Sequence, residues 1–181
     1  MNLREEKLSS TYYYKGAIIN MKVDKVRLPD GSVANREEVE HPGGCSIVAL
    51  TPDNEVFFVR QFRYAYDEVL LELPAGKLEA GEDPYEAMKR ELREETGCLA
   101  ERFVFLGTAY PTPGYTNELL RIWACRVSGT TQQDLDPGEF LEVEKMPLER
   151  ALEMVMNNKI ADAKSQIGIL KAANLVREGK L

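Results

Sequence analysis

The sequence contains a single histidine, His41, among its 181 residues. Histidine triads, three-histidine zinc sites and most serine-nucleophile schemes need an imidazole as base or ligand. The Pro-Gly pair that follows His41 indicates a turn residue rather than a catalytic base. Histidine-dependent chemistry is therefore excluded, and we expect any reaction to depend on carboxylates and a metal ion.

Cysteine, long apolar runs and positive charge are also scarce. Cys45, Cys98 and Cys125 have no metal-ligand spacing, which predicts reduced core residues in a cytoplasmic protein. No apolar run reaches 18 residues and the stretch MNLREEKLSS is polar, so we expect no membrane partner and no signal peptide. The formal net charge of −7 argues against nucleic acid as the partner. An acidic protein can still bind a phosphate ester when metal ions bridge the two.

The most informative stretch is Gly76 to Cys98, GKLEAGEDPYEAMKRELREETGC. Asp83 followed by Pro84 predicts the start of a helix, and Glu86 would complete a capping box. Gly97 predicts its end. The sequence therefore predicts a helix of about four turns between Asp83 and Gly97.

Three acids lie beside the apolar stripe of this helix, which consists of Tyr85, Met88 and Leu92. The acids are Glu91, Glu94 and Glu95. Grouped carboxylates at the edge of a buried face repel one another, and a divalent cation is the simplest compensation. Hard oxygen ligands select magnesium or manganese. The alternative is an exposed acidic helix, for which the far face, with Glu86, Lys89 and Arg93, is better suited.

The remainder of the chain predicts a mixed α/β protein in two parts. Residues 12–41 have strand-like patterning around a Pro29–Gly31 turn, which predicts an antiparallel hairpin within an N-terminal region, residues 1–41. So small a sheet must lie on the main domain, residues 42–181, or on a second subunit. Short apolar runs then alternate with turns, and two helices are expected at the C-terminal end. The second of these, residues 162–177, should face Ile167, Leu170 and Leu175 inward.

The helical stretch resembles, position for position, the signature of the Nudix hydrolases. The match comprises Gly76, five residues, Glu82, seven residues, and then Arg90-Glu91-Leu92-Arg93-Glu94-Glu95-Thr96-Gly97. Cys98 stands where the family usually has an aliphatic residue, and a free cysteine packs in the same way. The resemblance covers the chain after about residue 42. It implies an α/β/α sandwich with a mixed sheet, preceded by a small N-terminal antiparallel sheet.

Further positions resemble the ADP-ribose pyrophosphatase branch of this family. Pro113 lies sixteen residues beyond Gly97, as a proline does in that branch. Arg36-Glu37, Gln61-Phe62-Arg63 and the run from Leu71 to Gly76 are similar too. The resemblance implies hydrolysis of ADP-ribose to AMP and ribose 5-phosphate with Mg²⁺, or alternatively Mn²⁺. It also implies a homodimer through the N-terminal strands, with Arg36 acting on the other subunit's pocket.

The resemblance assigns site residues as well. Glu91, Glu94, Glu95 and the Ala75 carbonyl would hold the metal, while Arg90 would orient the glutamates through Glu82. Glu139, before the last strand, would bind metal or activate water, with Glu142 as the reserve choice. The substrate would be lined by Arg36, Glu37, Arg63, Thr112, Pro113, Gly114 and Glu118.

Two alternatives stay open. The signature indicates hydrolysis of a diphosphate linkage but does not specify the groups on either side of it. A GDP-sugar, a UDP-sugar or a dinucleoside polyphosphate could therefore be the substrate. The domain could also be a non-catalytic ADP-ribose-binding sensor, although a sensor has no need of the three glutamates.

Overall fold

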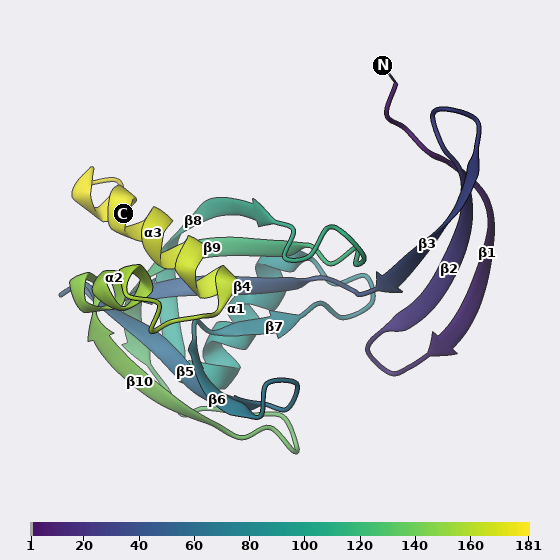
Figure 1. Ribbon diagram of the computed structural model, residues 1–181. Coiled ribbons are helices and arrows are strands. Elements are labelled where there is room, and N and C mark those ends of the chain that lie inside the picture. Colours follow the sequence, from purple (N-terminus) through teal and green to yellow (C-terminus); the bar gives the residue numbers. More distant parts are fainter. Residues whose placement is uncertain (1) are drawn as a thin grey trace. The chain divides into compact units, whose positions relative to one another are not determined.

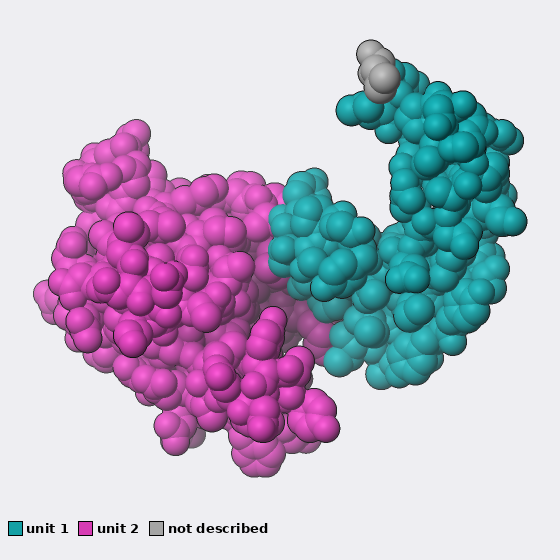
Figure 2. Space-filling view, viewed as in Figure 1, with its two compact units in different colours: residues 1–43, 110–119 teal, residues 44–109, 120–181 magenta. Residues whose placement is uncertain are grey.

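The computed structural model describes residues 2–181, which form two compact units (Figure 2). Unit 1 comprises the chain up to Gly43 together with Tyr110–Leu119, and unit 2 comprises Gly44–Ala109 with Leu120–Leu181. The loop Tyr110–Leu119 joins unit 1 through backbone bonds: the amide of Val39 donates to the Tyr115 carbonyl at 2.7 Å. Each unit is described separately below.

Unit 1 is a three-stranded antiparallel sheet of β1 (Glu6–Lys15), β2 (Asn20–Arg27) and β3 (Val33–Glu40), shown in Figure 1. The hairpin expected around Pro29–Gly31 is present as β2 and β3, but the sheet has β1 as an additional strand. Ala17–Ile19 lies between strands rather than within one. Two register shifts in β1, at Lys7/Ser9 and Tyr12/Tyr14, break the alternation by which a strand is recognised in sequence.

Unit 2 contains a seven-stranded mixed sheet. Its main path has the order β10-β5-β4-β9-β8, with β6 paired to β5, β7 paired to β4, and β4 parallel to β9. The strands are β4 (Gly44–Leu50), β5 (Glu55–Arg63), β6 (Glu68–Glu72), β7 (Ala75–Lys77), β8 (Cys98–Ala109), β9 (Leu120–Thr130) and β10 (Leu141–Pro147).

Helices cover both faces of this sheet (Figure 1). On one face, α1 (Pro84–Thr96) contributes Met88 and Leu92 to a buried cluster that also contains Trp123, the sole tryptophan. On the other face, α2 (Leu148–Met156) and α3 (Ala163–Arg177) pack on a cluster around Phe58. The α/β/α sandwich with a mixed sheet is therefore confirmed. The cysteines are buried and free, also as expected.

The inward face of α3 differs in part from the expectation: Ile167 and Leu175 pack against the core cluster as predicted, but Leu170 does not. Leu170 is 43% exposed, whereas Ile169 and Ala172 are fully buried. Gly168 explains the rotation, because a Cβ there would lie 2.7 Å from Leu73 Cδ1, so the helix backbone approaches the sheet closely at this point. This orientation also buries two polar side chains at the start of α3, Lys164 and Ser165.

A buried carboxylate, Glu72, lies at the end of β6. It is 2% exposed and accepts two hydrogen bonds from Arg63, at 2.6 Å from Nε and 2.8 Å from Nη2, and one from Lys164. Burial by itself raises the pKa of Glu72, but the two cations outweigh it and lower the pKa to about 2. Glu72 is therefore ionised in the folded state throughout the physiological range.

This ion pair predicts a pH dependence of folding stability. Because the folded pKa lies below the unfolded value of 4.5, the contribution of Glu72 is complete above pH 4.5 and is lost as the pH falls toward 2. Wild-type protein is expected to lose about 2 kcal/mol more of its unfolding free energy between pH 6 and pH 3 than Glu72→Gln. Urea denaturation at the two pH values measures both proteins. Equal losses would contradict the assignment.

Candidate functional site

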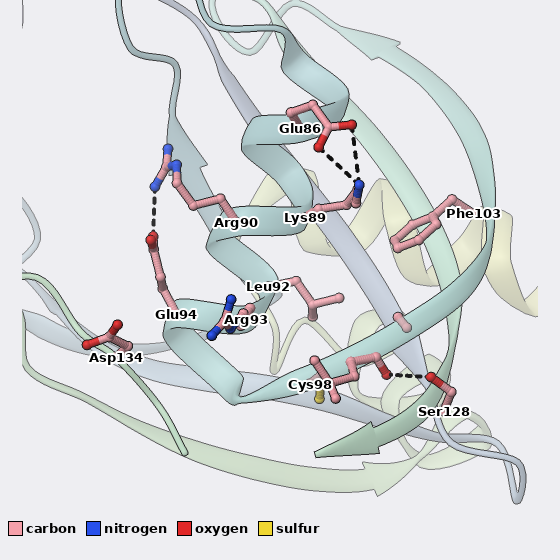
Figure 3. Close-up of a pocket in the computed structure, with 12 residues that line it drawn as sticks. Glu86, Lys89, Arg90, Leu92, Arg93, Glu94, Cys98, Phe103, Ser128 and Asp134 are labelled. Carbon is pink, nitrogen blue, oxygen red and sulfur yellow. Dashed lines mark hydrogen bonds and ion pairs between the residues drawn. The ribbon is translucent and has the colours of Figure 1, made fainter. Parts of the chain in front are cut away.

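Helix α1 begins and ends as its sequence indicates. The Asp83 side chain accepts hydrogen bonds from the amides of Tyr85 (3.0 Å) and Glu86 (3.2 Å), Pro84 occupies the first position, and Gly97 closes the helix with a left-handed φ of 68°. The capping box is not completed, because the Glu86 carboxylate pairs with Lys89 Nζ at 3.0 Å (Figure 3). The local sequence thus determines where α1 begins and ends, and with it the positions of the glutamates along the helix.

Arg90 forms ion pairs with three glutamates at α1 and the loop before it. Its Nε and Nη2 donate to the two oxygens of Glu82, at 3.0 and 3.2 Å. Its Nη1 donates to Glu94 at 2.7 Å, a contact visible in Figure 3, and its Nη2 lies 3.0 Å from Glu91 Oε1. One guanidinium therefore orients three carboxylates, as the resemblance implies for Arg90 and Glu82.

Glu95 lies one helical turn after Glu91 on α1 and is buried in the interior. It is 2% exposed, and its Oε2 accepts a hydrogen bond from the Ala75 amide at 2.9 Å. Among the residues that the structure describes, no Lys, Arg or His forms an ion pair with it. The pKa of Glu95 is raised to about 8, mainly by burial and also by the nearby charges of Glu91 and Glu139. The hydrogen bond from the Ala75 amide and the charge of Lys164 act in the opposite direction. A buried carboxylate in this situation gains most from a neighbouring cation.

Gly76 provides the space that Glu91 occupies. A Cβ at position 76 would lie 1.9 Å from both Cδ and Oε1 of Glu91, so only glycine allows the carboxylate to lie against the β7 backbone. Burial raises the pKa of Glu91; Arg90 opposes this, and the charges of Glu94 and Glu139 add to it. The Gly76 position of the signature is therefore explained by close approach of a side chain.

Glu139 lies in the loop before β10. Its Oε1 accepts a hydrogen bond from Gln61 Nε2 at 3.5 Å, and its charge contributes to the raised pKa values of Glu91 and Glu95. Glu142, the reserve choice, is an exposed residue of β10 that pairs with Arg60 of β5 in register. Of the two glutamates, Glu139 is the one whose charge acts on Glu91 and Glu95 of α1.

A loop whose contacts the sequence does not predict holds the C-terminal end of α1. Gln133 Nε2 donates to the Glu95 carbonyl at 2.5 Å, and the amide of Asp134 donates to the Glu94 carbonyl at 3.0 Å. Helix C-termini leave carbonyls without intrahelical partners, and these bonds satisfy two of them. No local pattern in residues 129–138 signals this contact, since its partners lie far away in sequence.

A pocket of about 460 Å³ lies beside the outer face of α1 (Figure 3). Of the predicted site residues, only Arg90 and Glu94 line it; the carboxylates of Glu91, Glu95 and Glu139 do not. Its lining is completed by Glu86, Lys89, Leu92, Arg93, Cys98, Leu99, Ala100, Phe103, Ser128 and Asp134. The pocket therefore does not bring the predicted metal-binding carboxylates together.

The predicted metal ligands share one region but do not converge on one point. Within residues 2–181, no group of three or more His, Cys, Asp or Glu side chains is arranged to hold an ion. Glu91 and Glu94 form ion pairs with Arg90, whereas Glu95 accepts a hydrogen bond from the Ala75 amide. The residues nevertheless fit a hard divalent cation in two respects. The ligand set is all oxygen, and Glu95 is a buried carboxylate without a cationic partner.

The predicted substrate residues divide between the two units. In unit 2, Arg63 forms an ion pair with Glu72 at 2.6 Å. In unit 1, Arg36 forms an ion pair with Glu5 at 2.6 Å, and Glu118 Oε1 lies 3.8 Å from His41 Nδ1. The other unit 1 candidates are Glu37 on β3 and Thr112, Pro113 and Gly114 in the loop after β8.

Comparison with known proteins gives two family matches. Residues 40–166 match the NUDIX domain, and residues 5–39 match the nucleoside diphosphate sugar hydrolase N-terminal domain. A solved structure entitled "Crystal structure of ADP compounds hydrolase" superposes with a TM-score of 0.84 at 19% identity, covering 100% of both chains. This likeness shows the fold.

Curated relatives cover most of the chain. An ADP-ribose pyrophosphatase of Bacillus subtilis is 34% identical over 170 residues, covering 93% of this chain and 92% of the relative. A methanol dehydrogenase activator of Bacillus methanolicus is 32% identical over 169 residues, with 91% and 90% covered. A GDP-mannose pyrophosphatase of Yersinia enterocolitica is 29% identical over 175 residues, with 91% and 90% covered.

Proposed function

Because the chain belongs to the Nudix hydrolase family, we propose that it hydrolyses the diphosphate linkage of ADP-ribose, giving AMP and ribose 5-phosphate. The observation that supports this best is the arrangement on α1. Arg90 orders Glu82, Glu91 and Glu94, while Glu95 lies buried without a cation partner. The 34% identity to an ADP-ribose pyrophosphatase supports the choice of substrate.

The proposed cofactor is Mg²⁺, with Mn²⁺ as its substitute. Glu91, Glu94, Glu95, Glu139 and the Ala75 carbonyl would hold it. When bound, a divalent ion neutralises diphosphate charge and acidifies a water molecule. Arg90 keeps Glu94 and Glu91 oriented, and the Gln61 amide holds Glu139 where its carboxylate can accept the proton of the attacking water. Attack on one phosphorus breaks its bond to the bridging oxygen, which leaves with the other phosphate.

We further propose a role for each part of the chain and a set of residues that contact the substrate. Residues 42–181 would form the hydrolase domain and residues 1–41 the dimerisation region. Arg63 would contact the diphosphate through the guanidinium nitrogen that Glu72 leaves free, since Glu72 takes only Nε and Nη2. The other proposed contacts are Arg36, Glu37, Thr112, Pro113, Gly114 and Glu118.

A homodimer is expected because one face of the N-terminal sheet exposes apolar side chains among its polar ones. Tyr14 is directly opposite Met21, and Val33 lies on the same face as both; these side chains are 57%, 37% and 52% exposed. Apolar side chains exposed on a sheet face are a common feature of protein–protein interfaces. Light scattering at micromolar concentration should give twice the chain mass, and Met21→Glu should shift the mass toward that of one chain. A monomeric wild type would contradict the dimer.

The three buried, free cysteines support a cytoplasmic location, where thiols stay reduced. None of the helices within residues 2–181 has the length and apolar character needed to cross a membrane.

A substrate panel tests the proposed activity. Purified protein with Mg²⁺ would receive ADP-ribose, GDP-mannose, a UDP-sugar and a dinucleoside polyphosphate, and nucleoside monophosphate release would be measured for each. We expect the highest kcat/KM for ADP-ribose. A higher value for GDP-mannose would favour the function named for the Yersinia relative. Tight binding of ADP-ribose without any AMP would instead indicate a sensor.

A further inference from the structure

A polar group lies buried at the start of α3, outside the residues assigned to catalysis. Lys164 is 8% exposed, Ser165 is fully buried, and Glu72, which faces them, is 2% exposed. Buried charges cost stability unless they are fully paired, and apolar residues of similar size are often at least as stabilising. The group therefore calls for an explanation other than core stability.

The contacts of this group fix two residues of the segment that follows β6. Lys164 Nζ bonds to Glu72, and it also lies 3.0 Å from Asp162 Oδ1. Ser165 Oγ accepts the Leu73 amide at 2.8 Å and donates to Asp162 Oδ2 at 2.5 Å. Asp162 is itself the N-cap of α3, so the whole group is anchored to a helix end. Glu72 and Leu73 are thus tied to α3.

The same segment continues to the proposed metal site. The Pro74 carbonyl accepts bonds from the Ile47 amide and Ser46 Oγ, both at 3.0 Å. The next amide, that of Ala75, donates to Glu95 Oε2 at 2.9 Å. Four consecutive residues are therefore held, and the last of them holds the Glu95 carboxylate. A shift of the segment would carry the Ala75 amide and carbonyl with it.

We propose that Lys164 and Ser165 are positioning residues for Ala75 and Glu95. They touch neither substrate nor metal; they act by fixing Glu72 and Leu73, which set the position of the segment that ends at Ala75. The inference rests on the proposed function, because it concerns the ligand geometry of that site. Groups that orient metal ligands without binding the metal commonly change metal affinity or activity by 10-fold to 100-fold when removed.

The test measures Mn²⁺ binding directly, by the electron paramagnetic resonance signal of free Mn²⁺ during titration of the full chain. Ser165→Ala removes the acceptor of the Leu73 amide with the smallest change in volume and is the deciding variant. Lys164→Met supports it, but it also removes a charge that acts directly on Glu95. In both variants the dissociation constant for Mn²⁺ is expected to rise about tenfold. With ADP-ribose and saturating Mg²⁺, kcat should fall while KM changes less than twofold.

Lys171→Met is the matched control. Lys171 is another lysine of α3 with a bonded ammonium group, since its Nζ donates to the Leu106 carbonyl at 2.6 Å. Its side chain forms no hydrogen bond or ion pair with residues 72–75. Its Mn²⁺ affinity and kcat should equal those of wild type. Thermal melts ensure that all titrations are made well below Tm.

Each result has one meaning. If Ser165→Ala is folded and binds Mn²⁺ as wild type does, the positioning role is wrong, while the proposed function stands. If Lys171→Met weakens Mn²⁺ binding equally, the effect is a general one of α3 and the positioning role is again wrong. If wild type binds no Mn²⁺, the metal site fails and the positioning role fails with it. Should Lys164→Met not fold, Ser165→Ala alone decides.

Discussion

Changing Glu91 and Glu95 together to glutamine is expected to lower kcat for ADP-ribose by a factor of about 10³ or more, because the substitution removes two of the proposed metal ligands and with them the charge neutralisation of the diphosphate. The fold should be retained. Glutamine matches glutamate in size, and at position 95 its side-chain oxygen can still accept the Ala75 amide. Initial rates of AMP release at saturating Mg²⁺ measure the loss.

Thermal melts separate loss of metal binding from loss of structure. In EDTA, the Tm of the double variant should equal or exceed that of wild type, because burial raises the pKa of Glu95 to about 8 and a neutral side chain avoids that cost of ionisation. Mg²⁺ should raise the Tm of wild type by binding only the folded state, and should leave the variant unchanged. Near-normal hydrolysis by the variant would refute the metal assignment.

Local chemistry explains what the sequence predicts well. Asp83, Pro84 and Gly97 determine the limits of α1 through bonds and backbone angles within a few residues, so the helix is found where the pattern indicates it. The sandwich is implied by the resemblance to the Nudix hydrolases rather than by periodicity. Of the apolar stripe expected on α1, Met88 and Leu92 are buried as predicted, but Tyr85 is 38% exposed.

Contacts that are distant in sequence explain what the sequence does not predict. The inward face of α3 depends on how closely Gly168 approaches Leu73, and Ser165 meets the Leu73 amide across 92 positions. The pairing of Arg90 with Glu94 is a local i,i+4 contact, and the resemblance already implies that Arg90 orients the glutamates. Nothing local, however, indicates that Gln133 reaches the carbonyl of Glu95, which is 38 residues away in sequence.

Gly76→Ala should lower kcat/KM about 100-fold with little loss of stability, because a displacement of about 1 Å in a catalytic geometry can have an effect of this size. The new Cβ would lie 1.9 Å from Glu91 Cδ, so that carboxylate must move. The atom displaced belongs to the flexible end of a side chain, and the φ of Gly76 lies outside the left-handed region. Neither the core nor the backbone is therefore strained by the methyl group.

Gly129→Ala is the control for adding a methyl group to a strand glycine, since its Cβ would meet only Leu99 Cδ1, at an ordinary 3.9 Å. Its kcat/KM should equal that of wild type. A double-mutant cycle then tests the cause: if Gly76→Ala acts by moving the Glu91 carboxylate, adding it to Glu91→Gln should cost much less than the 100-fold that it costs alone. Full additivity of the two losses would mean that the methyl group acts elsewhere, on the β7 backbone or on Ala75, and the close approach of Glu91 to Gly76 would have no catalytic importance.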